Sequence, residues 1–101
     1  MAHYLQLVTL TDEGRKAFQE NPDWINEVNK GIEIMGAKIL TQYGLLGQYD
    51  FVNIIEAPSD EVAAKLSIKL SAKGTMQPMT MAAIPLENLI DTLKKESHTP
   101  W

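Results

Sequence analysis

The chain has 101 residues, a formal net charge of −4 and no cysteine. This length corresponds to about one domain, and 45% hydrophobic with 22% charged residues is typical of a globular protein. Without cysteine, disulfides, thiol nucleophiles and cysteine-based metal sites are excluded. The nine Lys and Arg are scattered, which argues against a nucleic-acid partner. No basic region with a long apolar stretch opens the sequence, and no apolar run reaches the ~20 residues that span a bilayer, so we expect no signal peptide and a cytoplasmic protein without a membrane partner.

Strand-forming residues from His3 to Leu10 predict a first strand. Thr11, followed by two acidic residues, predicts the start of a helix. Asn21-Pro22 interrupts this helix and predicts a second helical piece, with Asn21 as its cap and Gly36 at its end. An apolar stripe at helical spacing supports the second piece: Trp24, Ile25, Val28, Ile32 and Met35.

The next two strands are expected at Ala37 to Tyr43 and Tyr49 to Ala57, joined by a short turn with two glycines. A second main helix begins near Pro58, with Ser59 as its cap, and ends at Gly74. The remaining elements are a strand from Thr75 to Ile84 and a short helix that begins at Pro85 and ends near Lys94 and Lys95.

This order predicts an α+β fold, a ferredoxin-like βαββαβ unit with a four-stranded antiparallel sheet and an added C-terminal helix. Right-handed crossovers place both main helices on one sheet face. The first and third strands are then central, and Pro78 lies in an edge strand, where proline is tolerated. We expect one domain over residues 1–96 and a tail over residues 97–101.

The sheet face without helices spans roughly 400 Å², from ~4.8 Å between strands and ~20 Å of strand length. A solvated face normally has alternating polar residues. The third strand instead has apolar residues at both odd and even positions, which point to opposite faces: Phe51, Val52, Ile54 and Ile55. The fourth is also largely apolar, with Met76, Met79 and Met81. An apolar face of this size favours an interface, so we expect a homodimer formed through the sheet faces.

The turn Gly44-Leu45-Leu46-Gly47-Gln48-Tyr49-Asp50 and the later segment Glu56-Ala57-Pro58-Ser59-Asp60-Glu61 resemble the GYD domain family. The Gly-x-Tyr-Asp signature is Gly47, Tyr49 and Asp50. The resemblance runs from Tyr4 to the last strand and excludes His98 to Trp101. It implies a dimeric α/β barrel, in which two sheets pack face to face around a central cavity, but it implies no mechanism.

Five residues are candidates for a ligand pocket: Tyr4, Gln6, Tyr49, Asp50 and Asn53. Tyr49 and Asp50 suit a proton donor and a carboxylate base, or alternatively a packed ring and a carboxylate that binds turn amides. Gln6 and Asn53 lie on central strands, where an unpaired buried amide costs roughly 1–3 kcal/mol. They either hydrogen-bond to each other or line a cavity.

The register of the third strand decides which residues face the barrel. One register gives Tyr49, Phe51, Asn53 and Ile55. The other gives Asp50, Val52, Ile54 and Glu56. Because an asparagine beneath the helices is the costlier placement, we expect the first register. On the first strand we expect Tyr4, Gln6 and Val8 to face the barrel.

His3 and His98 are the only histidines, and no ligand spacing predicts a metal site or cofactor. The leading hypothesis is a homodimeric domain that binds a small apolar or amphipathic molecule in or near the barrel, or only its own partner. One alternative is a cofactor-independent isomerase or monooxygenase for an aromatic or quinone-like substrate. A residue among Tyr4, His3, Tyr49, Asp50 and Asn53 would then transfer protons. Another alternative is a metabolite-sensing regulatory module.

Overall fold

The computed structural model describes residues 1–95 and has the predicted element order. The elements are β1 (Ala2–Leu10), α1 (Asp12–Glu20), α2 (Trp24–Ile34), β2 (Lys38–Gly44), β3 (Phe51–Ala57), α3 (Asp60–Ala72), β4 (Met76–Ala83) and α4 (Leu86–Lys94). The predicted α+β, ferredoxin-like arrangement is confirmed. The predicted tail, residues 97–101, lies outside the described residues.

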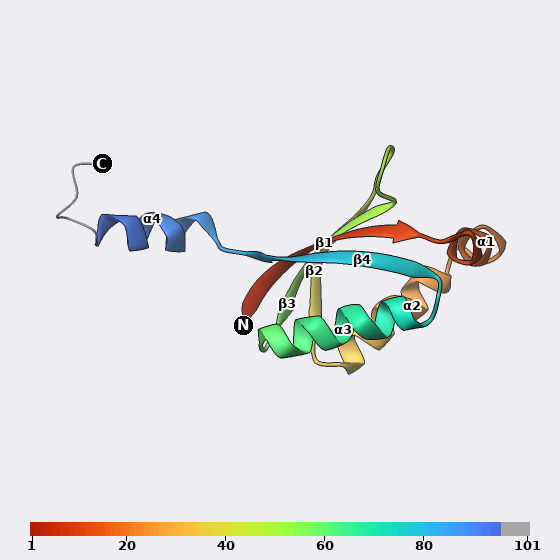
Figure 1. The fold of residues 1–101 in the computed structure, drawn as a ribbon, viewed down its shortest axis with the longest axis horizontal. Coiled ribbons are helices and arrows are strands. Elements are labelled where there is room, and N and C mark those ends of the chain that lie inside the picture. Colours follow the sequence, from red (N-terminus) through yellow and green to blue (C-terminus); the bar gives the residue numbers. More distant parts are fainter. Residues whose placement is uncertain (96–101) are drawn as a thin grey trace.

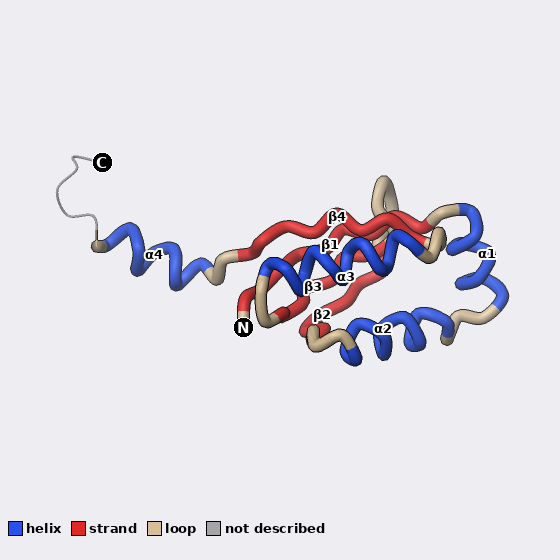
Figure 2. The backbone as a smooth tube through the Cα atoms, turned by 60° about the horizontal axis from the view of Figure 1, so that its bottom comes forward, coloured by secondary structure: helices blue, strands red, loops and turns tan. Residues whose placement is uncertain are grey.

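The four strands form one antiparallel sheet in the order β2-β3-β1-β4. The first and third strands are therefore central, as predicted, and Pro78 lies on the edge strand β4. Helices α2 and α3 lie beneath one face of the sheet, and α1 lies at one end (Figure 1). The loop between β2 and β3 rises above the other face, and α4 extends away from the sheet in both backbone views (Figure 2).

Predicted capping residues position the main helices. The Thr11 hydroxyl accepts a hydrogen bond from the Gly14 amide, and the Ser59 hydroxyl accepts one from the Val62 amide, both at 3.2 Å. A Cβ atom at Gly14 would lie 1.9 Å from the carbonyl oxygen of Thr75. Glycine at this position therefore lets α1 approach the residue that precedes β4.

The prediction for the start of α2 is wrong by two residues. Helix α2 begins at Trp24, after Asp23 at the cap position, and Asn21 is instead the C-terminal cap of α1. The Asn21 amide donates to the Ala17 carbonyl, and the Asn21 carbonyl accepts from the Trp24 amide. Because Asn21 closes the first helix, a short turn separates the two helices.

The core lies between the sheet and its helices. Alternate residues of the two central strands are buried there: Tyr4, Gln6, Val8 and Leu10 from β1, and Phe51, Asn53, Ile55 and Ala57 from β3. Ile32 of α2 and Leu66 and Leu70 of α3 cover them. No helix within residues 1–95 is both long enough and apolar enough to cross a bilayer.

Candidate functional site

The structure reverses the expected orientation of the central strands. Tyr4, Gln6 and Asn53 are at most 4% exposed and face the helices, as do their same-face neighbours Val8, Phe51 and Ile55. The expected register is therefore wrong. The cost assigned to an asparagine beneath helices applies only to an unpaired amide, and Asn53 is paired.

A row of polar side chains crosses the covered face of the sheet, with one residue from each strand. Gln42, Asn53, Gln6 and Thr80 lie directly opposite one another in the register of β2, β3, β1 and β4. The amide of Gln42 donates to Asn53 at 2.9 Å, and Asn53 donates to Gln6 at 3.2 Å. Gln6 then donates to the Thr80 hydroxyl at 3.2 Å. We call these four residues the polar row.

Each end of the polar row is hydrogen-bonded to a helix. Asn29 of α2 exchanges two hydrogen bonds with Gln42, at 2.8 and 3.2 Å. Ser67 of α3 lies 2.7 Å from the Thr80 hydroxyl and donates to the Ala63 carbonyl. Among the described residues, no buried side-chain nitrogen or oxygen lacks a partner. The amides of Gln6 and Asn53 are thus used within the core, and the row fixes strand register and helix position together.

Tyr4 lies beside the polar row and contacts the start of α3. Its hydroxyl donates a hydrogen bond to Asp60, the first residue of that helix. This hydrogen bond is the main reason that the pKa of Tyr4 is raised to about 12. The phenol therefore holds its proton more tightly than an unperturbed tyrosine does. Two surface hollows, of about 290 and 360 Å³, share the lining residues Tyr4, Asp60 and Ala82.

Asp50 holds three segments together at the opposite end of the sheet. Its carboxylate accepts a hydrogen bond from the Leu10 amide at 2.7 Å, and its own amide donates to the Val8 carbonyl at 2.8 Å. Its carbonyl accepts from the Leu45 amide, and its carboxylate lies 3.7 Å from the Arg15 guanidinium. The Gly-x-Tyr-Asp segment thus joins the β2–β3 loop to β1 and α1. Its aspartate carboxylate binds a strand amide, rather than the turn amides of the second alternative given for Asp50.

The remaining signature residues shape the loop. Gly47 has a φ of 117°, a conformation that favours glycine, whereas Gly44 has no positive φ. Tyr49 is half-buried. Together with α1, the loop borders an open hollow of about 590 Å³. Its lining is mostly apolar, with Leu10, Phe18, Leu45, Leu46 and Phe51 beside Arg15, Gln19, Gly44 and Asp50.

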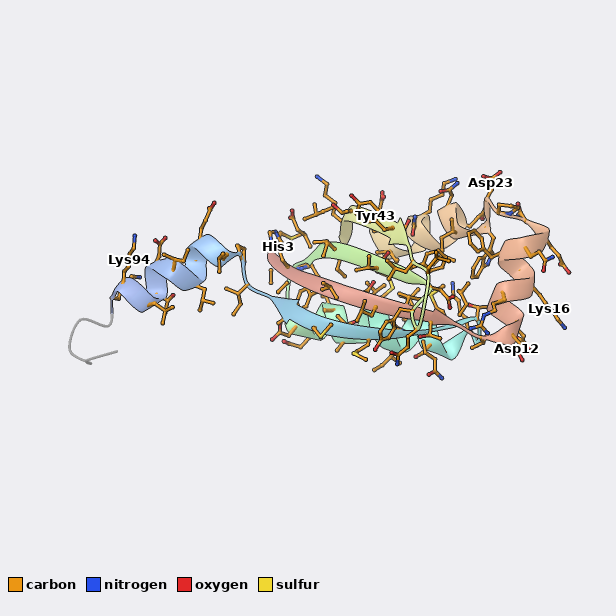
Figure 3. The ribbon with its side chains drawn as sticks, turned by 90° about the horizontal axis from the view of Figure 1, so that it is seen from above. His3, Asp12, Lys16, Asp23, Tyr43 and Lys94 are labelled. Atoms are coloured by element: carbon orange, nitrogen blue, oxygen red, sulfur yellow. The ribbon has the colours of Figure 1, made fainter. Side chains whose placement is uncertain are left out.

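The other sheet face is apolar at its centre and polar at its ends; we call it the open face. Its central rows pair Leu5 with Ile54 and Met81, and Leu7 with Val52 and Met79. Met79 and Met81 are 48% and 40% exposed, although both are large apolar side chains. At one end, His3 lies opposite Glu56, with 3.8 Å between the imidazole nitrogen and the carboxylate oxygen. Figure 3 shows this face, with His3 and Tyr43 labelled.

The described residues contain no cluster of three or more potential metal ligands. The imidazole of His3 lies near the carboxylate of Glu56, as noted above, and His98 lies outside the described residues. Sequence analysis missed Gln42 and Thr80 of the polar row, and Asp60 as the partner of Tyr4. A search for polar residues at matching positions of neighbouring strands, and for an acidic residue directly after a helix cap, would have identified them.

Comparison with known proteins gives relatives in sequence and in fold. One relative, from Thermus thermophilus, is 40% identical over 95 residues, which cover 93% of this chain and all of the relative. It is named glutamine synthetase and cystathionine beta-lyase binding protein. The crystal structure of TTHA0845 from the same organism matches with a TM-score of 0.53 at 16% identity, over 84% of this chain and 95% of that chain. This second likeness concerns the fold alone.

The sequence model of the GYD domain matches residues 4–93. This range runs from Tyr4 in β1 to Leu93 in α4, and it contains the Gly47, Tyr49 and Asp50 signature. The chain belongs to the GYD domain family.

Proposed function

We propose that this protein is a protein-binding domain, which pairs with a second copy through the open face and binds enzymes of amino-acid metabolism. The composition of the open face carries the proposal. Its centre is formed by Leu5, Leu7, Val52, Ile54, Met79 and Met81. Polar residues border this centre at both ends, with His3 and Glu56 at one and Thr9 and Gln77 at the other. An apolar core with a polar rim is the usual anatomy of a protein interface.

The choice of enzyme partners rests on the 40%-identical relative, which is named for binding glutamine synthetase and cystathionine beta-lyase. We propose the same class of partner here. We also propose a cytoplasmic location, because a chain without cysteine suits a reducing compartment in which disulfides do not form. The protein would then act by attaching to an enzyme rather than by catalysing a reaction. A cofactor-independent enzyme has less support, because Gln6 and Asn53 are occupied by the polar row and the Tyr4 hydroxyl is hydrogen-bonded to Asp60.

Pairing is tested with two matched substitutions, Ile54→Lys on the open face and Ile68→Lys on the exposed side of α3. We expect the Ile54→Lys variant to sediment as a folded monomer, because a lysine at the interface centre loses apolar contact and must be desolvated. Ile68 is 67% exposed, so its variant should keep the size of the wild type. A folded Ile54→Lys variant that sediments as a dimer would contradict pairing through this face.

Enzyme binding is tested by immobilising the full-length protein and measuring its affinity for purified glutamine synthetase and cystathionine beta-lyase. Both enzymes are taken from the organism that this protein itself comes from. We expect micromolar or tighter binding to at least one enzyme, a range typical of specific complexes. Serum albumin is the control for non-specific adsorption. If neither enzyme binds above the albumin level, these partners are wrong.

A second candidate function is the binding of a small apolar or amphipathic molecule between the paired open faces. The observation that favours it is the pair Met79 and Met81 on the open face, since methionine side chains adapt to varied apolar ligands. His3 and Glu56 at the end of the face supply polar contacts for such a molecule. Native mass spectrometry of protein purified from its own source should detect a dimer with added mass. A dimer without added mass would count against this function.

A further inference from the structure

Helix α4 is amphipathic, and within residues 1–95 no other element buries it. Its nine residues, Leu86–Lys94, include none that is buried. Its apolar side has four large side chains that are 41–67% exposed: Leu86, Leu89, Ile90 and Leu93. Figure 3 shows the side chains of this helix, including Lys94, standing clear of the sheet. The Cα radius of gyration is 16.3 Å, against about 13 Å for a compact chain of 100 residues.

A helix of this length does not form stably by itself. Isolated helices shorter than about 12–15 residues are marginal in water, because nucleation is costly and few hydrogen bonds follow. In proteins, such a helix is stabilised when its apolar side packs against another surface. The apolar stripe of α4 therefore requires a covering surface that the described part of its own chain does not supply.

We propose that α4 is an exchanged arm, whose apolar side packs against the second copy of this chain when the open faces pair. This inference rests on the pairing proposed above. Only Ile84 and Pro85 separate α4 from β4, and β4 contributes Met79 and Met81 to the open face. Ile84 is 64% exposed, so the link between β4 and α4 also presents an apolar side chain to the surface. A partner seated on the open face thus lies next to the base of α4.

The area needed by a stable dimer supports the same occupant. The open face alone offers roughly 400 Å² in projection. A standard interface buries about 800 Å² per partner. A helix of nine residues is about 14 Å long and ~10 Å wide, so it adds roughly 130 Å² on the partner and the same area where it receives the partner's arm. Exchange of the two arms therefore brings the interface close to the standard size.

The first test compares two double substitutions in the full-length protein. Leu89→Ala with Ile90→Ala removes the centre of the apolar side, whereas Glu87→Ala with Asp91→Ala alters only the polar side. Alanine keeps the helix propensity in both. By sedimentation we expect the dimer dissociation constant to rise at least a hundredfold for the first variant, since a symmetric dimer loses four side chains. The control should stay within about threefold of the wild type, and equal constants for the two variants would overturn the proposal.

The second test locates the surface that covers α4. Amide hydrogen exchange over residues 86–94 is followed by mass spectrometry in the wild type and in the monomeric Ile54→Lys variant. We expect slow exchange in the dimer and exchange at least tenfold faster in the monomer. Slow exchange in both would mean that the arm packs on its own chain, and fast exchange in both would mean that nothing covers it. Either result overturns the proposal.

These results separate failure of the arm from failure of the pairing. A wild type that sediments as a monomer refutes the pairing, and the arm exchange with it. A wild-type dimer with fast exchange in α4 refutes only the arm. If the Leu89→Ala and Ile90→Ala variant keeps its dimer constant but loses affinity for glutamine synthetase, the arm binds the enzyme instead of a second copy, which also overturns the proposal.

Discussion

The two faces of the sheet place their polar residues in opposite positions. On the covered face, the polar row crosses the middle of the sheet, and apolar residues lie on both sides of this row along the strands. On the open face, the middle is apolar and polar residues such as His3 and Glu56 lie at the ends. The comparison shows that a polar group can be central in a core when its partners come from the same chain. The apolar centre of the open face has no such cover within residues 1–95.

Two neighbouring isoleucines give the largest expected difference between the faces. Ile55 is fully buried beneath the helices, whereas Ile54 is half-buried on the open face. We expect Ile55→Lys to unfold the protein, because a buried unpaired charge costs several kcal/mol against a total stability of about 5–15 kcal/mol. Circular dichroism should show Ile54→Lys folded and Ile55→Lys unfolded at 25 °C. Equal stability of the two variants would remove the distinction between the faces.

The polar row gives the next largest effect. Asn53→Leu removes one of the two hydrogen-bond partners of Gln6 and one partner of Gln42, and it should lower the free energy of unfolding by roughly 2–4 kcal/mol. The measurement is urea denaturation followed by fluorescence. Replacing Gln6 and Asn53 together by leucine should cost less free energy than the sum of the single changes. In the double variant, neither of these two amides is left in the core without the other. Strictly additive costs would mean that the row is not a coupled network.

The carboxylate of Asp50 gives a smaller effect at the end of the sheet where the loop rises above the open face. Asp50→Asn keeps the shape but removes the charge that accepts from the Leu10 amide and lies near Arg15. Hydrogen bonds to charged groups contribute about 1.5–3 kcal/mol, so we expect a loss of roughly 1–2 kcal/mol of stability. Amide exchange at Leu45, which donates to Asp50, should quicken. An unchanged unfolding midpoint would show that the charge contributes nothing.

The titration of Tyr4 gives no effect at neutral pH and one that appears only at high pH. Its pKa is raised from 10.0 to about 12 in the folded state, chiefly by the hydrogen bond to Asp60. The folded state thus holds this proton more tightly than the unfolded state. The stability from this difference is fully present below pH 10 and is lost as the pH rises to about 12. The free energy of unfolding, measured by urea denaturation, should fall less steeply with pH over this window for Tyr4→Phe than for the wild type. Parallel plots of this free energy against pH for the two proteins would refute the linkage.

Much of the fold could be predicted from local chemistry in the sequence. Thr11 and Ser59 identified the helix starts because hydroxyl side chains satisfy free amides there. Pro78 identified an edge strand because it lacks an amide hydrogen. The start of α2 was misplaced because Asn21 is suited to both ends of a helix, and only its bond to Ala17 shows which end it caps.

The candidate site was predicted less well, for a physical reason that Asn53 illustrates. In β3, apolar residues occupy both odd and even positions, so the pattern of polar and apolar residues does not show which face of the strand is buried. The desolvation argument then favoured the wrong face, since it assumed an amide without partners. Those partners, Gln6 and Gln42, are 47 and 11 residues away in the sequence.

By itself, the sequence determined the element order, the antiparallel ferredoxin-like sheet and membership of the GYD domain family. These depend on short-range patterns of capping, strand formers and turn residues. Only the tertiary structure decided which side of β1 and β3 is buried, that Gln42, Asn53, Gln6 and Thr80 form one row, and that the rest of residues 1–95 leaves α4 without cover. The physical reason is that hydrogen-bond satisfaction and burial are properties of residues brought together across the sheet, whatever their separation along the chain.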